Sequence, residues 1–376
     1  MKIVLIGTVS SSIFGFRKLL LQSLVKGGHE VYTFTTDLTP ELQKRAKDEL
    51  GVHAEKYQLA RTGMNPLIDI KNALQLRQLL KELQPDYVFC YFAKPVIWGT
   101  LAAWSAGVKN RYGMLEGLGY YFTDDPNRNS IKKRLIRRIQ VGLFHVALPF
   151  LKGLIVLNPD DKKDLLEKYH IRIKNVMVLG GIGLDLDEYA YSQPDISKIR
   201  FIFVGRLLAE KGIIEFLKAA EVIKVEYPGV EFVVLGNPDP ANAGSVDPLY
   251  LDSLVKQGTV IYPGSVPNVA EWLADSSVFV LPSYREGVPR STQEAMAVGR
   301  PVITTDVPGC RETIVDGENG FKVSAHNPTP VAEAMQKFIE KPDLVLKMGL
   351  RSRELAVQKF NAVEVNQRLA YFLELQ

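Results

Sequence analysis

Residues 283–299 read Ser283-Tyr-Arg-Glu-Gly-Val-Pro-Arg-Ser-Thr-Gln-Glu-Ala-Met-Ala-Val-Gly299. They follow the apolar run Val278 to Leu281, which predicts a strand buried on both faces, and they end in a helical pattern that stops at Gly299. A strand, a loop and a helix in this order bring Glu286 and Glu294 to the carboxyl edge of a parallel sheet, where open α/β folds bind ligands.

Glu294 has a second interpretation. Ser291 and Glu294 have the spacing of a capping box, in which the Glu side chain returns a hydrogen bond to the start of the helix. The local pattern does not choose between this cap and a ligand-binding role. The role of Glu286 depends on the rest of the chain.

The composition is that of a soluble globular protein. The 376 residues exceed the usual size of a single core, so we expect two domains; 46% apolar and 23% charged residues is an ordinary balance. The net charge of +4 is small, so anion binding requires local clusters of Lys and Arg. Cys90 and Cys310 lack metal-ligand spacing, which favours packing in a reducing compartment. The first apolar run, Ile3 to Gly7, is too short for a signal peptide and predicts a strand.

Two series of strands and helices predict an α/β fold. The first starts at Ile3 and continues through a helix to a second strand at His29–Phe34. The second starts at Ile199, after a turn-rich segment from Gly180 to Asp195. The first loop lacks a Gly-x-Gly-x-x-Gly fingerprint, which disfavours a dinucleotide-dependent dehydrogenase.

Two cations follow the first strand of the second series. Arg206 and Lys211 lie between Gly205 and Gly212, where a strand passes into a helix. A helix N-terminus contributes only about 0.3–1 kcal/mol to an anion, too little to stabilise a departing nucleoside diphosphate. Charge-assisted hydrogen bonds from both side chains supply the rest. Elsewhere on a surface loop they would be ordinary solvated cations; their position favours a diphosphate site.

The loop Glu116-Gly-Leu-Gly-Tyr-Tyr-Phe122 carries an acid, two glycines and three aromatic residues. Aromatic faces stack on the C–H faces of a sugar, while a carboxylate binds its hydroxyl groups. The alternative is a Gly-rich turn whose aromatic residues pack in the core.

A basic amphipathic helix is predicted between Asn127 and Phe144. At about 1 kcal/mol for each Lys or Arg, five cations contribute roughly 5 kcal/mol toward an anionic membrane surface before screening. The apolar tract that follows, Val141 to Leu157, is shorter than the ~20 residues that span a bilayer. A solvated charged helix is the alternative, and a nucleic-acid surface is disfavoured because no known module accompanies it. The cations, interleaved with Ile131, Leu135, Ile136 and Ile139, are Lys132, Lys133, Arg134, Arg137 and Arg138.

Asp185 and Asp187 have the spacing of a pair that holds Mg²⁺ or Mn²⁺ beneath a diphosphate. They lie in the turn-rich segment without a third ligand nearby. Turn chemistry is therefore the favoured interpretation.

Two of these motifs, the one around Arg206 and Lys211 and the one around Glu286 and Glu294, together resemble a known family. Gly205-Arg206…Lys211-Gly212 and Glu286-Gly-Val-Pro-x₄-Glu294-Ala-x-Ala-x-Gly-x-Pro-Val302 resemble the retaining glycosyltransferases of family 4, of the GT-B type, with Val288 where Phe is commoner. The resemblance implies two Rossmann-like doubly wound domains that face a central cleft. These would be an acceptor domain over 1–190, to which a helix at about 360–376 returns, and a nucleotide-sugar domain over 198–358.

The resemblance also assigns roles to residues of the donor site. Arg206 and Lys211 would neutralise the leaving diphosphate, Glu286 would face the hydroxyls of the donor sugar, and Glu294 would hold the ribose. The helix start at Gly287, Val288 and Pro289 would add to diphosphate binding. Members of the family work without a metal, so no cofactor is expected.

On the acceptor side, the resemblance suggests Glu116 as a candidate catalytic residue. In the first loop, Gly7, Ser11 and Ser12 would line the acceptor side or the far end of the diphosphate. Retention by front-face attack lets the leaving diphosphate take the proton of the acceptor, so no enzymic general base is required.

Within the family, the chain looks most like bacterial enzymes that extend undecaprenyl-diphosphate-linked saccharides, among them GalNAc transferases. This implies a UDP-sugar donor, a lipid-linked acceptor and a peripheral location on the inner face of the cytoplasmic membrane, in O-antigen, capsule or glycan biosynthesis. Three alternatives stay open: a GT-B enzyme with a soluble acceptor, a non-catalytic sugar-nucleotide-binding protein, and a GT-A enzyme that uses Asp185 and Asp187.

Overall fold

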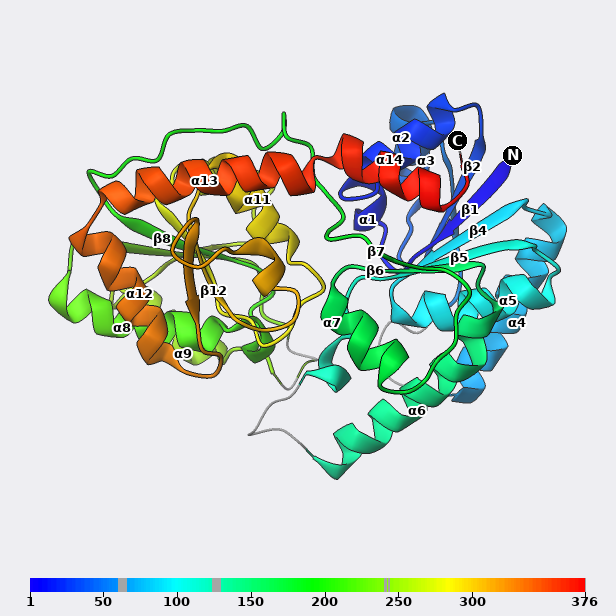
Figure 1. Ribbon diagram of the computed structural model, residues 1–376, viewed down its shortest axis with the longest axis horizontal. Helices are drawn as coiled ribbons and strands as arrows, with labels where there is room; N and C mark the ends of the chain where they lie inside the picture. Colours follow the sequence, from blue (N-terminus) through cyan, green and yellow to red (C-terminus); the bar gives the residue numbers. More distant parts are fainter. Residues whose placement is uncertain (60–65, 124–129, 240–241, 243, 376) are drawn as a thin grey trace. The chain divides into compact units, whose positions relative to one another are not determined.

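The protein consists of two compact units, each built around one parallel sheet. Figure 1 shows the computed structural model, which describes residues 1–59, 66–123, 130–239, 242 and 244–375. The first unit contains Met1–Tyr121, Asn129–Ile182 and Val363–Gln376. The second contains Gly183–Ala362 and a short segment that begins at Phe122.

The first sheet has the order β3-β2-β1-β4-β5-β6-β7, and every pairing in it is parallel. The central strand β4 is buried along its whole length, as expected for a strand covered by helices on both faces. The strands are β1 (Lys2–Ile6), β2 (Glu30–Thr35), β3 (His53–Lys56), β4 (Tyr87–Tyr91), β5 (Asn110–Leu115), β6 (Gly153–Val156) and β7 (Val176–Val178).

The helices of the first unit alternate with its strands. The helix Thr100–Ser105 is directly preceded by a π-helical turn at Pro95–Gly99. Gly99 is needed there, since a Cβ at this position would lie 2.7 Å from the Cys90 sulfur. The helices are α1 (Ser11–Phe14), α2 (Lys18–Lys26), α3 (Pro40–Leu50), α4 (Pro66–Leu83), α5 (Thr100–Ser105), α6 (Ile131–Ala147) and α7 (Pro159–Asp161), followed by a π-helical turn at Lys162–Glu167.

The second sheet repeats this arrangement with the order β10-β9-β8-β11-β12-β13. Its strands are β8 (Arg200–Val204), β9 (Glu231–Leu235), β10 (Ile261–Gly264), β11 (Val278–Leu281), β12 (Val302–Thr305) and β13 (Gly320–Val323). Its helices are α8 (Ile213–Glu226), α9 (Pro248–Lys256), α10 (Val269–Ala274), α11 (Arg290–Val298), α12 (Pro328–Glu340) and α13 (Asp343–Phe360).

Both sheets have the strand order of a doubly wound Rossmann-like fold, which confirms the predicted fold class. In each sheet the direction of strand progression reverses once, between β1 and β4 in the first and between β8 and β11 in the second. Ligands of such folds bind beyond the carboxyl ends of the strands that flank the reversal. A ligand-binding site is therefore expected in the loops that follow these four strands.

The boundary between the units falls at Ile182, earlier than the limit at residue 190 expected from the sequence. Hydrogen bonds from two arginines tie the segment that follows to the second unit. Arg300 is fully buried and donates to the carbonyls of Ser192 (2.8 Å) and Leu273 (2.9 Å). Arg353 donates to the carbonyl of Tyr189 at 3.1 Å.

The C-terminal helix α14 (Ala362–Phe372) belongs mostly to the first unit. The Tyr87 hydroxyl on β4 donates to the carbonyl of Leu373 at 2.7 Å. The Phe372 ring lies over Gly153, where a Cβ would come within 2.8 Å of it. The first sheet therefore relies on residues from the far end of the sequence.

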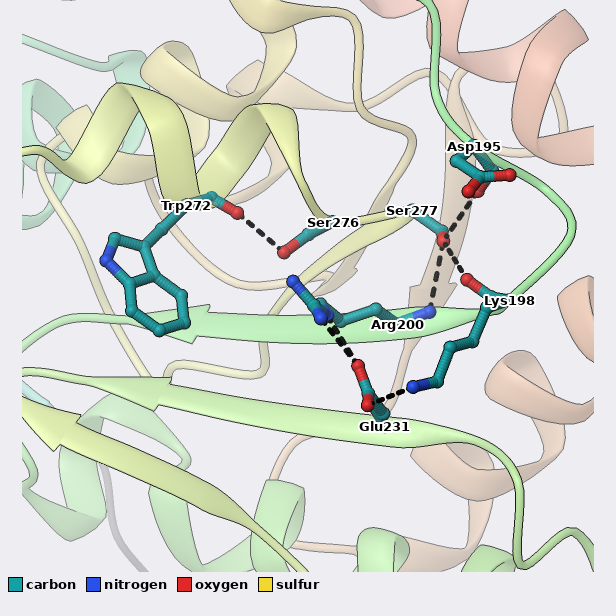
Figure 2. A network of polar contacts seen from close by, with 7 residues as sticks. All are labelled: Asp195, Lys198, Arg200, Glu231, Trp272, Ser276 and Ser277. Carbon is teal, nitrogen blue, oxygen red and sulfur yellow. Dashed lines mark hydrogen bonds and ion pairs between the residues drawn. The ribbon is translucent and has the colours of Figure 1, made fainter.

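A polar network ties the second sheet together at the opposite edge, where its strands begin (Figure 2). The Ser277 hydroxyl accepts from the Arg200 backbone N–H at 3.0 Å and lies 3.2 Å from the Asp195 carbonyl, to which it donates. Glu231 on β9 accepts from the Arg200 side chain at 2.8 Å and pairs with Lys198. Burial alone raises the pKa of Glu231, but hydrogen bonds and charge from Lys198 and Arg200 outweigh it and lower the pKa.

We expect Glu231→Gln to lower the free energy of unfolding by about 1 kcal/mol at pH 7. Because the folded-state pKa of Glu231 is lowered, its contribution is present above the unfolded-state value of about 4.3 and is lost as pH falls through the folded-state value. Urea unfolding at neutral and acidic pH measures this difference, which should shrink in acid. Glu226→Gln, at an exposed position of the same unit, is the control. An equal cost at both pH values would contradict the electrostatic explanation.

Candidate active site

An ion pair joins the two loops at the reversal of the second sheet. Lys211 follows β8 and Glu286 follows β11, and these strands are neighbours. The Lys211 ammonium donates to both oxygens of Glu286, at 2.6 and 2.7 Å. Their side chains are 21% and 9% exposed. The structure thus brings together two residues that lie 75 positions apart and were selected from separate motifs.

The two loops are also fastened to each other through their backbones. The Tyr284 backbone N–H donates to the carbonyl of Glu210 at 2.9 Å, and its hydroxyl donates to Glu215 Oε1 at 2.7 Å. Gly212 has a φ of +75°, and a Cβ there would lie 2.1 Å from the Pro282 oxygen. The loops pack so closely that only glycine fits at their contact, which holds the ion pair in place.

The loop after β12 supports Glu286 from its other side. The Glu286 backbone N–H donates to the carbonyl of Pro308 at 3.0 Å. Gly309 has a φ of +80°, and a Cβ there would lie 2.2 Å from the backbone carbonyl oxygen of Glu286. The Ser283 hydroxyl donates to Glu286 Oε1 at 2.8 Å, so the carboxylate is held by side-chain and backbone contacts alike.

Of the two interpretations of Glu294, the structure excludes the capping box at the start of α11. The helix begins at Arg290, its N-cap residue is Pro289, and no side chain caps it. Ser291 therefore lies inside the first turn, and Glu294 lies in the second. A capping box needs Ser at the N-cap and Glu three residues later, but Pro289 occupies the N-cap, so neither Ser291 nor Glu294 has the required position.

Glu294 is instead anchored within its own helix. Its Oε1 accepts from Arg290 Nε at 2.7 Å, and Tyr189 provides a further side-chain hydrogen bond. Burial raises the pKa of Glu294, although the charge of Arg290 and both hydrogen bonds oppose the rise. A buried, anchored carboxylate is a rigid acceptor for a ligand hydroxyl.

The other predicted donor-site residues lie on the same loops. Arg206 comes directly after β8 on the Lys211 loop, and its side chain is exposed. Gly287, Val288 and Pro289 are buried in the approach to α11. All seven predicted donor residues thus belong to the β8 loop, the β11 loop or α11.

The carboxyl edge of the first sheet differs from the sequence prediction. Ser11 is exposed at the start of α1, but Ser12 is fully buried, and its hydroxyl lies 2.8 Å from the Tyr91 hydroxyl. Gly7 leaves room for the Tyr91 ring, because a Cβ at this position would lie 2.2 Å from it. Gly7 and Ser12 therefore accommodate Tyr91 and do not line a solvent-accessible site.

Glu116 lies directly after β5 and forms an ion pair with Arg17, a residue that was not among the predicted site residues. The Arg17 side chain is only 3% exposed. The sequence does contain an indication of this buried charge, since Arg17 interrupts the apolar pattern of Phe16 and Leu19 in the first helical stretch.

The basic helix is confirmed as α6, but two of its five cations face its own unit. Lys133 is buried with its ammonium 4.3 Å from the centre of the Tyr120 ring, and Arg137 Nε donates to the carbonyl of Tyr121 at 2.6 Å. Residues 127–129 of the predicted segment lie outside the described residues. The exposed face of α6 carries Lys132, Arg134 and Arg138 together with Ile131, Leu135, Ile139 and Val146.

Asp185 and Asp187 form a local turn, in which the Asp187 backbone N–H donates to Asp185 Oδ1 at 3.0 Å. Over the ranges that the structure describes, no group of three or more His, Cys, Asp or Glu residues has an arrangement that would hold a metal ion. Over the same ranges, no helix is long and apolar enough to cross a membrane.

Two family models match the chain in succession. Residues 18–185 match the model described as glycosyltransferase family 4, and residues 198–341 match glycosyl transferases group 1. The chain belongs to the family 4 glycosyltransferases, and its two Rossmann-like domains form the GT-B fold. The alternative of a GT-A enzyme that uses Asp185 and Asp187 is therefore wrong.

Individual relatives match most of the chain, and one matches nearly all of it. An N,N'-diacetylbacillosaminyl-diphospho-undecaprenol α-1,3-N-acetylgalactosaminyltransferase of Campylobacter jejuni is 26% identical, over 95% of this chain and 94% of the relative. A UDP-Gal:α-D-GlcNAc-diphosphoundecaprenol α-1,3-galactosyltransferase of Escherichia coli is 26% identical over 79% and 77%. Among solved structures, Anabaena HepE in complex with UDP and glucose superposes with a TM-score of 0.77 at 18% identity, covering 100% of both chains.

We expect Gly212→Ala to destabilise the second unit. A non-glycine residue at this φ costs roughly 1–2 kcal/mol, and the contact with Pro282 forces the two loops apart at further cost. Thermal and urea unfolding measure the loss. Gly229→Ala in the same unit is the matched control, because a Cβ there meets no atom within 4 Å. Equal stability of the two variants would show that the loops are not closely packed in solution.

Proposed function

We propose that this glycosyltransferase transfers a hexose or N-acetylhexosamine, such as GalNAc, from a UDP-sugar to a saccharide carried on undecaprenyl diphosphate, with retention of configuration. The reaction would serve O-antigen, capsule or other glycan biosynthesis. The observation that carries the proposal is the Lys211–Glu286 pair at the strand reversal of the second sheet, in a chain related along its length to a polyprenyl-diphosphate-linked GalNAc transferase.

The ion pair explains how the site tolerates charge before the donor binds. Lys211 and Glu286 neutralise each other in the structure. The diphosphate of a donor would compete with Glu286 for the ammonium, since both are anions. The released carboxylate would then accept hydrogen bonds from the hydroxyls of the transferred sugar. Arg206, exposed on the same loop, would supply the second cation.

The start of α11 would complete the diphosphate site. Backbone N–H groups of Gly287 and Val288 precede the helix, whose N-terminus favours an anion. Pro289 has no N–H, so its role is to shape the helix start and not to donate. Glu294, anchored by Arg290, would accept a hydrogen bond from a ribose hydroxyl.

The chemistry requires little beyond charge stabilisation and positioning. The bond between C1 of the sugar and the diphosphate oxygen breaks, and the acceptor hydroxyl bonds to C1 on the same face. The hydroxyl proton passes to the departing diphosphate, which Lys211 and Arg206 stabilise. We propose that no metal takes part.

Two competing functions predict different results. A GT-B enzyme with a soluble acceptor would transfer to free saccharides without a lipid. A non-catalytic binding protein would bind UDP-sugars and transfer nothing.

The lipid-linked acceptor is supported by the exposed face of α6. Ile131, Leu135, Ile139 and Val146 are 79%, 55%, 43% and 56% exposed, and their spacing places them along one face of the helix. Lys132 borders this stripe on one side, and Arg134 and Arg138 border it on the other. An apolar stripe flanked by cations suits the interface of an anionic membrane. We propose that the enzyme is peripheral on the inner face of the bacterial cytoplasmic membrane.

Transfer from UDP-sugars tests the reaction. We expect UDP-GalNAc or UDP-Gal to raise the melting temperature, and UDP to be released when GlcNAc-diphosphoundecaprenol or its diacetylbacillosaminyl counterpart is added. Lys211→Met should lower kcat by about 100-fold or more, since a charged donor to the leaving group is lost. Lys218→Met, at an exposed site on α8, should leave kcat unchanged.

Each competing outcome is distinct. Stabilisation by GDP- or ADP-sugars and not by UDP-sugars would count against the donor assignment. Transfer abolished by EDTA would refute the metal-free mechanism. Donor binding without transfer to any acceptor would favour the binding protein.

Flotation with liposomes tests the membrane face. We expect the wild-type protein to float with vesicles that contain phosphatidylglycerol. Replacing Lys132, Arg134 and Arg138 by Glu should weaken binding at least 100-fold, because each cation contributes about 1 kcal/mol. Replacing Lys26, Lys44 and Lys47 by Glu changes the net charge equally on other helices of the first unit and is the control. Equal loss in both triple variants would show that net charge alone governs binding.

A further inference from the structure

The carboxyl edge of the first sheet contains a buried ion pair that spans the strand reversal. Arg17 lies between α1 and α2, after β1, and Glu116 follows β5. Strand β4 lies between β1 and β5, so the pair reaches across its carboxyl end. Arg17 Nη2 donates to Glu116 Oε1, and the side chains are 3% and 12% exposed.

The guanidinium of Arg17 lies in an aromatic and sulfur-containing environment. It is 4.7 Å from the centre of the Tyr91 ring and 5.2 Å from that of Phe16. Nη2 also lies 3.1 Å from the Met114 sulfur, which is a weak acceptor. Among the described residues, Arg17 Nε is buried without a hydrogen-bond acceptor.

Stability alone does not explain this pair. Removing two charges from water costs several kcal/mol for each ion, and the cost is recovered only when the remaining donors are well satisfied. Arg17 fails this condition at Nε. Well-packed apolar side chains of similar volume would stabilise such a site as well or better.

The surrounding loop is shaped to keep the pair in position. The Tyr91 ring, which supports Arg17, occupies the space that a side chain at Gly7 would need. The Tyr91 hydroxyl is fixed by Ser12 at 2.8 Å. After Glu116 the backbone turns through Gly117 (φ +123°), a conformation that other residues rarely adopt. The chain therefore fixes both members of the pair at the edge where ligands of this fold bind.

We propose that Arg17 is a positioning residue that holds Glu116 as a fixed carboxylate, ready to accept a hydrogen bond from a hydroxyl of the acceptor saccharide. This inference rests on the proposed function. The charge-assisted hydrogen bond from Arg17 to Oε1 restricts the rotation of the carboxylate. A carboxylate fixed in this way aligns the acceptor without taking its proton.

Steady-state kinetics of Arg17→Met, Glu116→Gln and the double variant test the inference. The assay varies GlcNAc-diphosphoundecaprenol or its diacetylbacillosaminyl counterpart, whichever the wild-type enzyme uses, at saturating UDP-sugar, and then the reverse. We expect each single variant to lower kcat/KM for the acceptor about 10–100-fold, because a hydrogen bond to a charged group is lost. KM for the UDP-sugar should change less than about twofold.

The double variant distinguishes positioning from separate structural roles. If Arg17 acts through Glu116, the double variant will be no worse than the poorer single variant. Arg172→Met, which removes an exposed arginine of the same unit, should behave like the wild type. Multiplicative losses, or equal effects on donor and acceptor KM, would overturn the inference.

If Arg17→Met does not fold, a second substitution at the same position tests the inference. Arg17→Lys keeps the charge but loses the planar fork, so the folded variant should show the same selective loss for the acceptor, to a smaller degree. Wild-type kinetics in folded Arg17→Lys and in Glu116→Gln would overturn the inference. Absence of transfer by the wild-type protein would instead refute the proposed function.

Discussion

The structure depends on one constraint, the close contact between the β8 and β11 loops at the strand reversal of the second sheet. Gly212 allows the Pro282 carbonyl to approach to a distance that no other residue permits. That contact brings Lys211 to Glu286, and the loop after β12 fixes Glu286 from behind. The charged groups of the site are therefore set by backbone packing, and their geometry does not depend on long flexible side chains finding each other.

The sequence predicted the sheet framework and the donor loops well, because both leave local signals. The strand expected at Val278–Leu281 has these limits in the structure, since it is a short apolar run followed by a loop. Glu286 and Lys211 were selected from their places after buried strands. Their direct pairing depends on which strands are neighbours, and a single sequence does not reveal strand order.

The remaining differences arise where local pattern and packing compete. Ser291 and Glu294 have capping-box spacing, yet Pro289 and not Ser291 is the N-cap residue of α11. In α6, five cations within seven residues are distributed around more than half of the helix, so their pattern does not reveal which of them face inward. Lys133 turns toward Tyr120, a contact that depends on the preceding loop. The role of Arg17 could not be predicted from local sequence, because its partner Glu116 lies 99 positions away.

The return of the chain after Ala362 has a consequence for biosynthesis. The residues of β1 to β7 precede the second unit in the sequence, but α14, which packs beside β4 and β6, comes after it. As the chain leaves the ribosome, the first sheet is synthesised early and waits for its last helix. The second unit, whose sheet and main helices are contiguous, has all of these elements available before the first unit does. The domain that begins first in the sequence is thus the one that is completed last.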